Sequence, residues 1–499
     1  MPYSKWMTLV LASVLSEIEE ELTQTIDAQT EQIVALVVEF LSRDISPTST
    51  LDFENRLQDT LREVGRIIAE FTYNAAQPED PEQQPHDVGH EGGGYRRLNK
   101  KTANRHVATL FGKITLHRYG YRYWHDSREA VIFPLELQLG LVEGATPAVA
   151  GEAARMMAET GATQKTVLKR LRRQFGVGWG EEKLRDLTRA ISESMDQFRR
   201  HFQVQKLREL LKKAYTSKGK HKVVLSVGRD GISLGIKWKK SFEMGSTATI
   251  TVYDRNGKRL GTVYLGYAPE SKQQTMTDEL TSVIQELLKD WKKAPPRLCY
   301  VTDAGDTETQ YYQKVLCRMS DPHRPGKRLH WYRIIDYYHT TEKITTMAEA
   351  VFGPGQKATA WARKARKLLL KPGGPSRVLY SAAAIRSYHG LRSWQVEEFE
   401  KAYNYIRSRT RHMQYHQYRA LGLPIGSGVT EAACKTVYTQ RLKLSGMRWG
   451  HAGAQVILSL RVILLSGIWD DVYRAAVDAR TYAIGTYAID ARPSLSNAA

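Results

Sequence analysis

Three acidic side chains have sequence contexts that can fix them rigidly and bring them together. Asp230 closes the apolar run Val-Val-Leu-Ser-Val-Gly-Arg-Asp, Asp303 closes Leu-Cys-Tyr-Val-Thr-Asp, and Glu431 follows Gly-Ser-Gly at the start of a basic helix. Carboxylate oxygens are preferred ligands of Mg²⁺, and carboxylates held at one point can bind two such ions beside a phosphodiester. We therefore predict that these three residues are catalytic and metal-binding, with two Mg²⁺ ions per active site and Mn²⁺ as a possible substitute.

Each of these acids also has an ordinary structural interpretation. An aspartate at a strand end often caps a turn. A glutamate in the first turn of a helix is stabilised by the helix dipole. The joint arrangement, with two strand ends and one late helix, is what favours a metal site over three unrelated caps.

The hydrophobic pattern predicts the elements that must position these acids. Strands are expected at 223–238, 247–253, 258–267, 298–302 and 333–335, and helices at 272–291 and 306–319. The pair Asn256-Gly257 predicts a hairpin turn before the third strand. The order of three strands, helix, strand, helix, strand is that of the ribonuclease-H-like fold. We predict an α/β ribonuclease-H-like catalytic core whose first part spans 221–339.

The charge of the chain points to a polyanionic partner. The formal net charge is +20 and the isoelectric point is about 9.6. Residues 1–80 contain 15 acidic and 5 basic residues, so the remaining residues carry a net charge of +30. A strongly basic body of this kind binds nucleic acid by releasing its counterions.

The acidic N-terminal region, 1–74, is expected to be a helical hairpin. Apolar residues recur at helical spacing over 8–42 and 51–72. The hairpin either packs on the body or pairs with another subunit, so a homodimer or higher homo-oligomer is expected. Residues 75–97 are rich in Pro, Gln and Gly, which predicts a flexible linker.

Two regions that precede the core are predicted to contact DNA. In the β-ribbon expected over 98–145, Arg118 and Arg122 alternate with aromatic residues that could stack on bases, although an aromatic sheet face with solvated arginines is the alternative. The helical region 146–220 resembles a helix-turn-helix, a pattern that is also common in helical bundles. The predicted DNA contacts of its second helix are Lys165, Lys169, Arg170, Arg172 and Arg173.

The C-terminal part of the chain is expected to complete the core. Residues 340–423 form a basic helical insertion, with 13 Lys/Arg and 3 Asp/Glu from 357 to 412. Residues 424–483 form the second part of the core and contain the Glu431 helix, and 484–499 are expected to be a disordered tail. The predicted DNA-facing residues that follow Glu431 are Lys435, Arg441 and Arg448.

Three widely spaced cysteines, Cys299, Cys317 and Cys434, support neither a zinc site nor a disulfide framework. No apolar run approaches the length needed to span a bilayer, and the first 15 residues lack the features of a signal peptide. We expect no membrane partner and a cytoplasmic, nucleoid-associated location.

The motifs above resemble those of DDE transposases of bacterial insertion sequences, in the Kra-type group and more distantly in the Mutator-like elements. The resemblance covers roughly 105–475. It rests on Gly-Arg-Asp-Gly, Val-Thr-Asp-Ala-Gly, Ile-Ile-Asp-Tyr-Tyr-His, Gly-Ser-Gly-Val-Thr-Glu-Ala-Ala-Cys-Lys and Ser-Gly-Met-Arg-Trp. Such enzymes have a helical insertion before the glutamate helix. Related proteins often carry a cysteine-rich zinc element near the N-terminus, and this chain departs from that pattern.

The resemblance implies roles for individual residues. One ion at Asp230, Asp303 and Glu431 would activate water or a DNA 3′-hydroxyl, and the other would stabilise the leaving oxygen. Asp336 and His339 match the Asp-x-x-His element of Mutator-like enzymes. His339 could bind phosphate or shuttle a proton, or simply pack at a strand–helix junction, and Asp336 could replace Glu431 as the third metal ligand.

The expected function is therefore a DNA transposase that binds transposon terminal repeats and target DNA, and catalyses strand cleavage and strand transfer. A nuclease or resolvase using the same triad is the first alternative. A domesticated DNA-binding protein without catalysis is the second, and an RNA-directed ribonuclease is a third that leaves the basic insertion unexplained.

Overall fold

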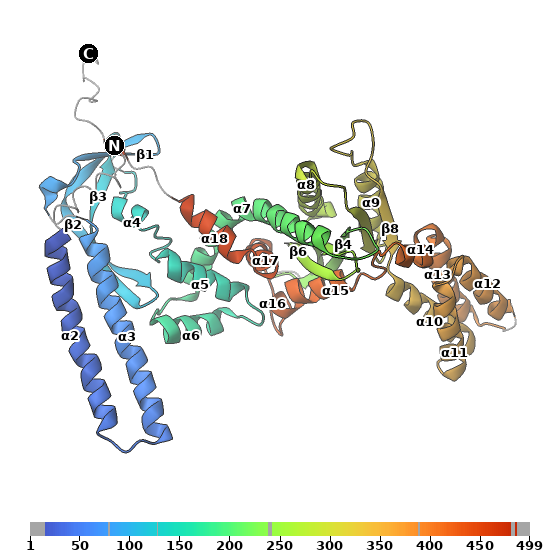
Figure 1. Ribbon diagram of the computed structural model, residues 1–499, viewed down its shortest axis with the longest axis horizontal. Helices are drawn as coiled ribbons and strands as arrows, with labels where there is room; N and C mark the ends of the chain where they lie inside the picture. The colour runs from blue at the N-terminus through green and yellow to red at the C-terminus, as the bar shows by residue number, and fades with distance from the viewer. Residues whose placement is uncertain are drawn as a thin grey trace, which may run out of the picture. The chain divides into compact units, whose positions relative to one another are not determined.

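A computed structural model describes residues 15–77, 80–126, 128–237, 242–387, 390–480 and 485–486 (Figure 1). The chain is mixed α/β and divides into two compact units. Unit 1 comprises Met1–Met157, Ala162–Met195 and Tyr473–Ala499, and unit 2 comprises Ala158–Gly161 and Asp196–Val472. The expected disordered tail at 484–499 lies outside the described residues except for the short strand β9 (Gly485–Thr486).

Unit 1 begins with a helical hairpin of α2 (Leu15–Leu41) and α3 (Pro47–Ala75), seen in blue in Figure 1. The predicted hairpin is confirmed, although the part of its first helix before Leu15 lies outside the described residues. The second helix begins earlier than expected. Ser46 forms a capping box with Ser49, and Pro47 occupies the first turn, where its missing N–H costs nothing.

A twisted sheet of β1 (Asp87–His90), β2 (Gly93–Thr109) and β3 (Gly112–Tyr123) follows the hairpin, with β9 paired to β1. A β-ribbon forms as β2 and β3, but it ends at Tyr123 and does not extend to 145 as expected. The flexible linker expected over 75–97 is wrong in its second half, which forms β1 and the start of β2. Val88 is fully buried against Tyr119 and Tyr121, which gives β1 an apolar contact that its Gly- and His-rich sequence hides.

The remaining elements of unit 1 are the 3₁₀ turn η1 (Pro81–Gln83) and helices. The helices are α4 (Pro134–Gln138), α5 (Pro147–Ala158), α6 (Gln164–Phe175), the first part of α7 (Glu181–Thr216) and the end of α18 (Trp469–Asp478). Two helices, α5 and α6, form in the region where a helix-turn-helix is predicted. A Thr163–Thr166 capping box begins α6, and Gly176 ends it in a left-handed conformation with φ 66°.

Unit 2 is built on a five-stranded mixed sheet of β4 (Val224–Gly235), β5 (Phe242–Tyr253), β6 (Arg259–Tyr267), β7 (Arg297–Thr302) and β8 (Trp331–Ile335). The strand order is β6-β5-β4-β7-β8. The β4–β5 and β5–β6 pairs are antiparallel, and the β4–β7 and β7–β8 pairs are parallel. The predicted order of an antiparallel meander followed by parallel strands is confirmed.

Both faces of this sheet are covered. Leu225 and Val227 of β4 pack in one apolar core with α7, α8 (Gln274–Asp290) and Tyr311 of α9 (Asp306–Lys314). Val224, which points the opposite way, packs in a second core with the helices that follow β8. The short turns η2 (Ser271–Gln273) and η3 (Leu316–Arg318) flank α8 and α9.

The helical insertion expected over 340–423 is present. Its elements are α10 (Tyr337–Phe352), α11 (Gln356–Leu369), α12 (Gly374–Ser387), α13 (Ser393–Arg407), η4 (Thr410–His412) and α14 (Tyr415–Ala420), which gather in one bundle in Figure 1. Buried Phe399, Ile406 and Tyr415 centre its core. The same core includes Val224, Val301 and Ile334 of the sheet, so the insertion is a folded helical body that packs on the sheet.

The chain then returns to the sheet as α15 (Gly428–Ala433), the π-helix η5 (Cys434–Thr439) and α16 (Gln440–Leu442), followed by α17 (His451–Leu465). Gly467 takes a φ of 65° and separates α17 from α18 (Trp469–Asp478). Among the described residues, no single helix is long and apolar enough to span a membrane. Together α17 and α18 have sufficient length and apolar character, but they are bent by 118°.

Candidate functional site on the sheet of unit 2

The parallel strands bring Asp230 and Asp303 to one level of the sheet. Asp303 follows the end of β7, as expected, but Asp230 does not end its strand, because it lies within β4 and is paired with Thr247 of β5. The last registered pair of β4 and β7 is Val227 with Tyr300, and each aspartate lies three residues beyond its member of that pair. Neighbouring strands are about 4.8 Å apart, so the two carboxylates leave the sheet side by side. Ala304, immediately after Asp303, has a φ of 70° and turns the chain sharply into α9.

Glu431 reaches the same place because α15 lies directly on the sheet. A Cβ at Gly228 would stand 1.9 Å from the Thr430 hydroxyl, so only glycine allows this approach. The hydroxyls of Thr430 and Thr249 are hydrogen-bonded at 2.8 Å, which ties the helix to β5. Glu431 follows Thr430 and therefore starts from a fixed backbone position.

Asp336 holds the loop that leads into α15. It is fully buried, and one carboxylate oxygen accepts the backbone N–H of His339 at 2.6 Å while the other accepts that of Ser427. Ser427 in turn donates from its hydroxyl to Glu431 at 2.7 Å. Both Asp336 oxygens are thus engaged by the backbone, which suits a positioning residue; its assignment as a metal ligand stays a prediction.

The three predicted catalytic acids line one pocket of about 260 Å³, together with His339, Ser427 and Arg229. Asp230 and Asp303 are half-buried and Glu431 is exposed. His339 stands at the rim, where its Nδ1 lies 3.2 Å from Glu342 and its ring packs edge-on against Tyr405. The structure therefore gathers residues that are separated by up to about two hundred positions in sequence.

Burial and mutual repulsion shape the electrostatics of the pocket. Burial is the main cause that raises the pKa of Asp230, and the Asp303 and Glu431 carboxylates raise it further. Two hydrogen bonds act in the opposite direction, from the Cys434 thiol at 3.3 Å and from the Gly231 N–H at 2.8 Å. An array of carboxylates so placed stabilises cations, because each cation relieves the repulsion among them.

A fourth acid belongs to this cluster although its sequence context did not single it out. Glu308, on the first turn of α9, is 7% exposed, and burial followed by the charge of Asp303 raises its pKa. A Cβ at Gly305 would stand 2.3 Å from the Glu308 carboxylate and 3.7 Å from that of Asp303, so both lie at the same turn. The sequence feature that could have identified Glu308 is its position five residues after Asp303.

The donor set fits Mg²⁺ by its chemistry, but the side chains as placed do not form a preassembled metal centre. Within the described part of the chain, no group of three or more His, Cys, Asp or Glu side chains is arranged to hold a metal ion. The acids are engaged elsewhere: Asp303 accepts the Gly305 N–H, Glu431 accepts Ser427, and Asp230 accepts Cys434. Metal binding would require these hydrogen bonds to exchange, so the ligand assignment stays a prediction.

Arg229 is a second functional candidate that the sequence analysis passed over. It is 1% exposed, and its guanidinium lies 5.3 Å from the Tyr311 ring centre. It donates to the Thr277 hydroxyl and to the Gln273 side chain, both at 2.9 Å, so α8 orients it. A buried fixed cation beside the acids offsets part of their repulsion, and its charge lowers the pKa of Glu308.

The structure separates the predicted DNA-contact residues into two groups. The exposed ones are Lys165, Lys169, Arg170, Arg172, Arg173, Arg122, Lys435 and Arg448. Arg118 and Arg441 are buried, and for them a direct DNA contact is contradicted. Arg118 pairs with Glu136 at 2.7 Å over the Phe133 ring, and Arg441 lies over the Trp449 ring, with burial lowering its pKa to about 10.

The comparisons with known proteins add nothing to this geometry. No protein-family model matches the chain, and no curated protein matches it either.

Proposed function

We propose that this protein is a DNA transposase that cleaves and joins DNA strands through Asp230, Asp303 and Glu431. The observation that carries the proposal is the shared pocket, which strand β4, the turn after β7 and helix α15 supply with carboxylates. Single strand-end acids often cap turns, but three acids from three elements on one pocket need a further explanation, because their repulsion disfavours the folded state.

The architecture around the pocket supports the same proposal. Three antiparallel strands are followed by two parallel ones in the sheet β6-β5-β4-β7-β8. This agrees with the element order expected above for a ribonuclease-H-like core. The helical insertion lies between β8 and the glutamate helix, as the resemblance to DDE transposases implies. The exposed basic residues of α6 offer a separate surface for DNA backbone contacts.

The chemistry assigns a task to each group. Asp230, Asp303 and Glu431 would hold divalent cations that, when bound, activate the nucleophile and stabilise the leaving 3′-oxygen. Asp336 fixes the Ser427 backbone and thereby the start of α15. His339, at the rim, is placed to contact a phosphate or accept a proton.

Homo-oligomerisation is part of the proposal. Among the described residues, eight of fourteen exposed large apolar side chains lie on or between α2 and α3, including Val34, Val38 and Leu41 at 55%, 57% and 67% exposure. A soluble helix pair rarely leaves such a face uncovered, so a second copy of the hairpin is the proposed cover. Replacing these three residues by glutamine should lower the mass measured by light scattering without changing the helix content.

The decisive test is an assay that contains both donor-end and target DNA. The wild-type chain with Mg²⁺ should give strand-transfer products, whereas nicks alone would favour the nuclease alternative. Asp230→Asn, Asp303→Asn and Glu431→Gln should each lose at least about 10³-fold in cleavage and retain DNA binding. Asp306→Asn is the matched control, because Asp306 is an exposed acid on α9 that does not line the pocket. Equal activity in all four variants would refute the triad.

A further inference from the structure

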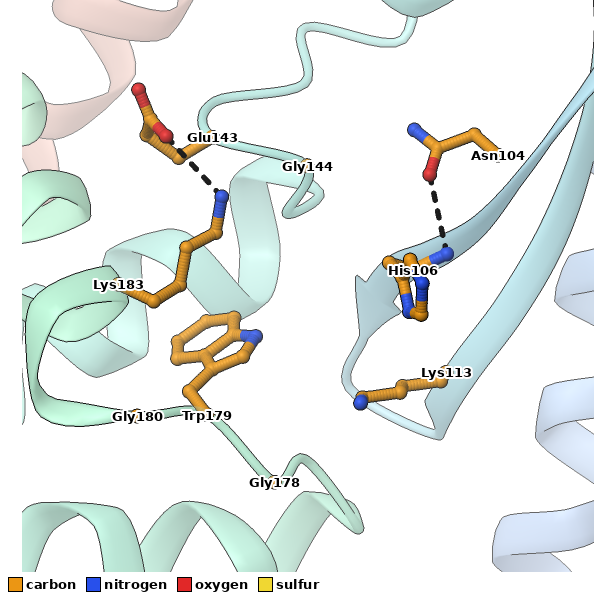
Figure 2. Close-up of a pocket in the computed structure, with 9 residues that line it drawn as sticks. All are labelled: Asn104, His106, Lys113, Glu143, Gly144, Gly178, Trp179, Gly180 and Lys183. Atoms are coloured by element: carbon orange, nitrogen blue, oxygen red, sulfur yellow. Dashed lines mark hydrogen bonds and ion pairs between the residues drawn. The ribbon is translucent and has the colours of Figure 1, made fainter.

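A second pocket, in unit 1, is built from parts that the proposed cleavage reaction does not use. Its volume is about 460 Å³, within the range of small-ligand sites. Figure 2 shows its two walls. His106 and Lys113 project from the β2–β3 hairpin, and Trp179 and Lys183 project from the start of α7 and the loop before it.

Trp179 is the central feature of this pocket. It stands between Gly178 and Gly180, and a Cβ added at either glycine would meet no atom within 4 Å. The two glycines therefore leave the space beside the half-buried indole open. The loop itself is not loose at its ends, because Gly176 caps α6 and the carbonyl of Gly180 accepts the Leu184 N–H of α7.

The rim of the pocket is basic. Lys183 pairs with Glu143 at 3.2 Å, a contact in which both side chains are partly exposed. Lys113 is exposed, and the described residues offer it no ion-pair partner. An open aromatic face with ammonium groups beside it matches a ligand that combines a planar ring with an anionic group.

We propose that this pocket binds one unpaired nucleobase of a DNA strand, stacked on Trp179, with Lys113 and Lys183 contacting the adjoining phosphates. The ring lies inside a pocket, so a base must leave the helical stack to reach it. DNA is the favoured strand because the exposed basic face of α6, in the same unit, ends only a few residues before Trp179. The inference rests on the DNA-binding part of the proposed function and is independent of cleavage.

Substitutions in the Glu143–Lys183 pair should change DNA affinity in opposite directions, which a purely structural pair would not do. If Lys183 serves phosphate, Glu143 competes for it, so Glu143→Gln should tighten binding while Lys183→Gln weakens it. A pair that only holds the fold would make both variants weaker. The two substitutions remove one charge each and keep similar side-chain size.

The experiment uses the full chain in EDTA, so that cleavage cannot occur, and fluorescence anisotropy with three labelled DNA duplexes. One duplex carries a central unpaired nucleotide, one is fully paired, and one has an abasic residue at the bulge. The wild type should prefer the unpaired base roughly tenfold over both others. Trp179→Ala should lose that preference and keep its affinity for the paired duplex, with Trp394→Ala, which alters an exposed tryptophan of unit 2, as the matched control.

Several results would overturn the proposal: no preference in the wild type, equal loss for all three duplexes in Trp179→Ala, or tighter binding of the matching RNA bulge. Circular dichroism of each variant excludes misfolding, and Trp179→Phe, which keeps an aromatic face, should restore part of the preference. Failure of the proposed function looks different, because a wild type that prefers the bulge but never cleaves with Mg²⁺ loses the transposase assignment and keeps this site.

Discussion

The two pockets of this chain differ in charge and in how they are built. The pocket of unit 2 is lined by carboxylates from within β4, from the turn after β7 and from a helix that packs on the sheet. The pocket of unit 1 is lined by an indole on a loop and by lysines at the start of β3 and of α7, with one acid, Glu143. Acids repel phosphate unless cations are present, whereas lysines attract it at once. The difference suggests that holding DNA and reacting with it are tasks for separate places.

The difference between the two pockets can be tested first in unit 2, where adding a single methyl group should reduce cleavage. Gly228→Ala places a Cβ 1.9 Å from the Thr430 hydroxyl and must push α15 and Glu431 off the sheet. We expect a loss of about 10²-fold in cleavage and a destabilisation of about 1–3 kcal/mol. Gly428→Ala is the control, since a Cβ there meets nothing within 4 Å. Similar kinetics for both variants would show that the contact does not position Glu431.

A large effect is also expected at the basic surface of unit 1. Replacing Lys169, Arg170, Arg172 and Arg173 by glutamine should weaken DNA binding and lower the slope of log affinity against log salt, by roughly 0.9 for each phosphate that the variant no longer neutralises. Arg118→Gln gives the contrast, because its buried guanidinium pairs with Glu136. That variant should reduce the melting temperature and leave the salt slope unchanged. A reduced slope in Arg118→Gln alone would reverse our assignment of these two sites.

The same contrast between surface and interior separates what could be predicted from the sequence from what could not. Periodicity predicted the five strands of unit 2 in their order along the chain, since each strand buries a short apolar run. It could not tell Arg118 from Arg122, because the partner of Arg118 lies on α4 and is brought close only by folding. Arg441 is similar, with an aromatic partner, Trp449, beyond the next turn.

The three acids of the candidate site were predicted from the sequence, whereas the buried residues beside them were not. Asp230, Asp303 and Glu431 stand in recognisable contexts, but Arg229 and Glu308 take their meaning from neighbours on other elements. The linker expected over 75–97 failed for a related reason. Its polar composition predicted solvent exposure, whereas one residue, Val88, supplies the buried contact that makes β1 a strand.

A more moderate effect should appear in the stability of the acid pocket. The raised pKa of Asp230 means that folding favours its protonated form. The ionised form therefore destabilises the fold at neutral pH, and this penalty disappears below the ordinary value of 3.8. Asp230→Asn should raise the melting temperature by roughly 1–4 °C at pH 7 and by nothing at pH 3. Differential scanning fluorimetry at both pH values tests this, and a lower melting temperature at pH 7 would contradict it.

The smallest expected effect concerns the thiol that donates to Asp230. Burial is the main cause that raises the pKa of Cys434, so the sulfur keeps its proton and remains a donor at neutral pH. Cys434→Ala removes that donor, which should raise the pKa of Asp230 further and move the acidic limb of the cleavage profile to higher pH. Cys434→Ser keeps a donor and should leave the limb close to the wild type. A pH profile that shifts equally in both variants would mean that packing, not the hydrogen bond, links Cys434 to the acid. Because the shift is confined to unit 2, binding of an unpaired base at Trp179 should not change in either variant, which keeps the two pockets experimentally separate.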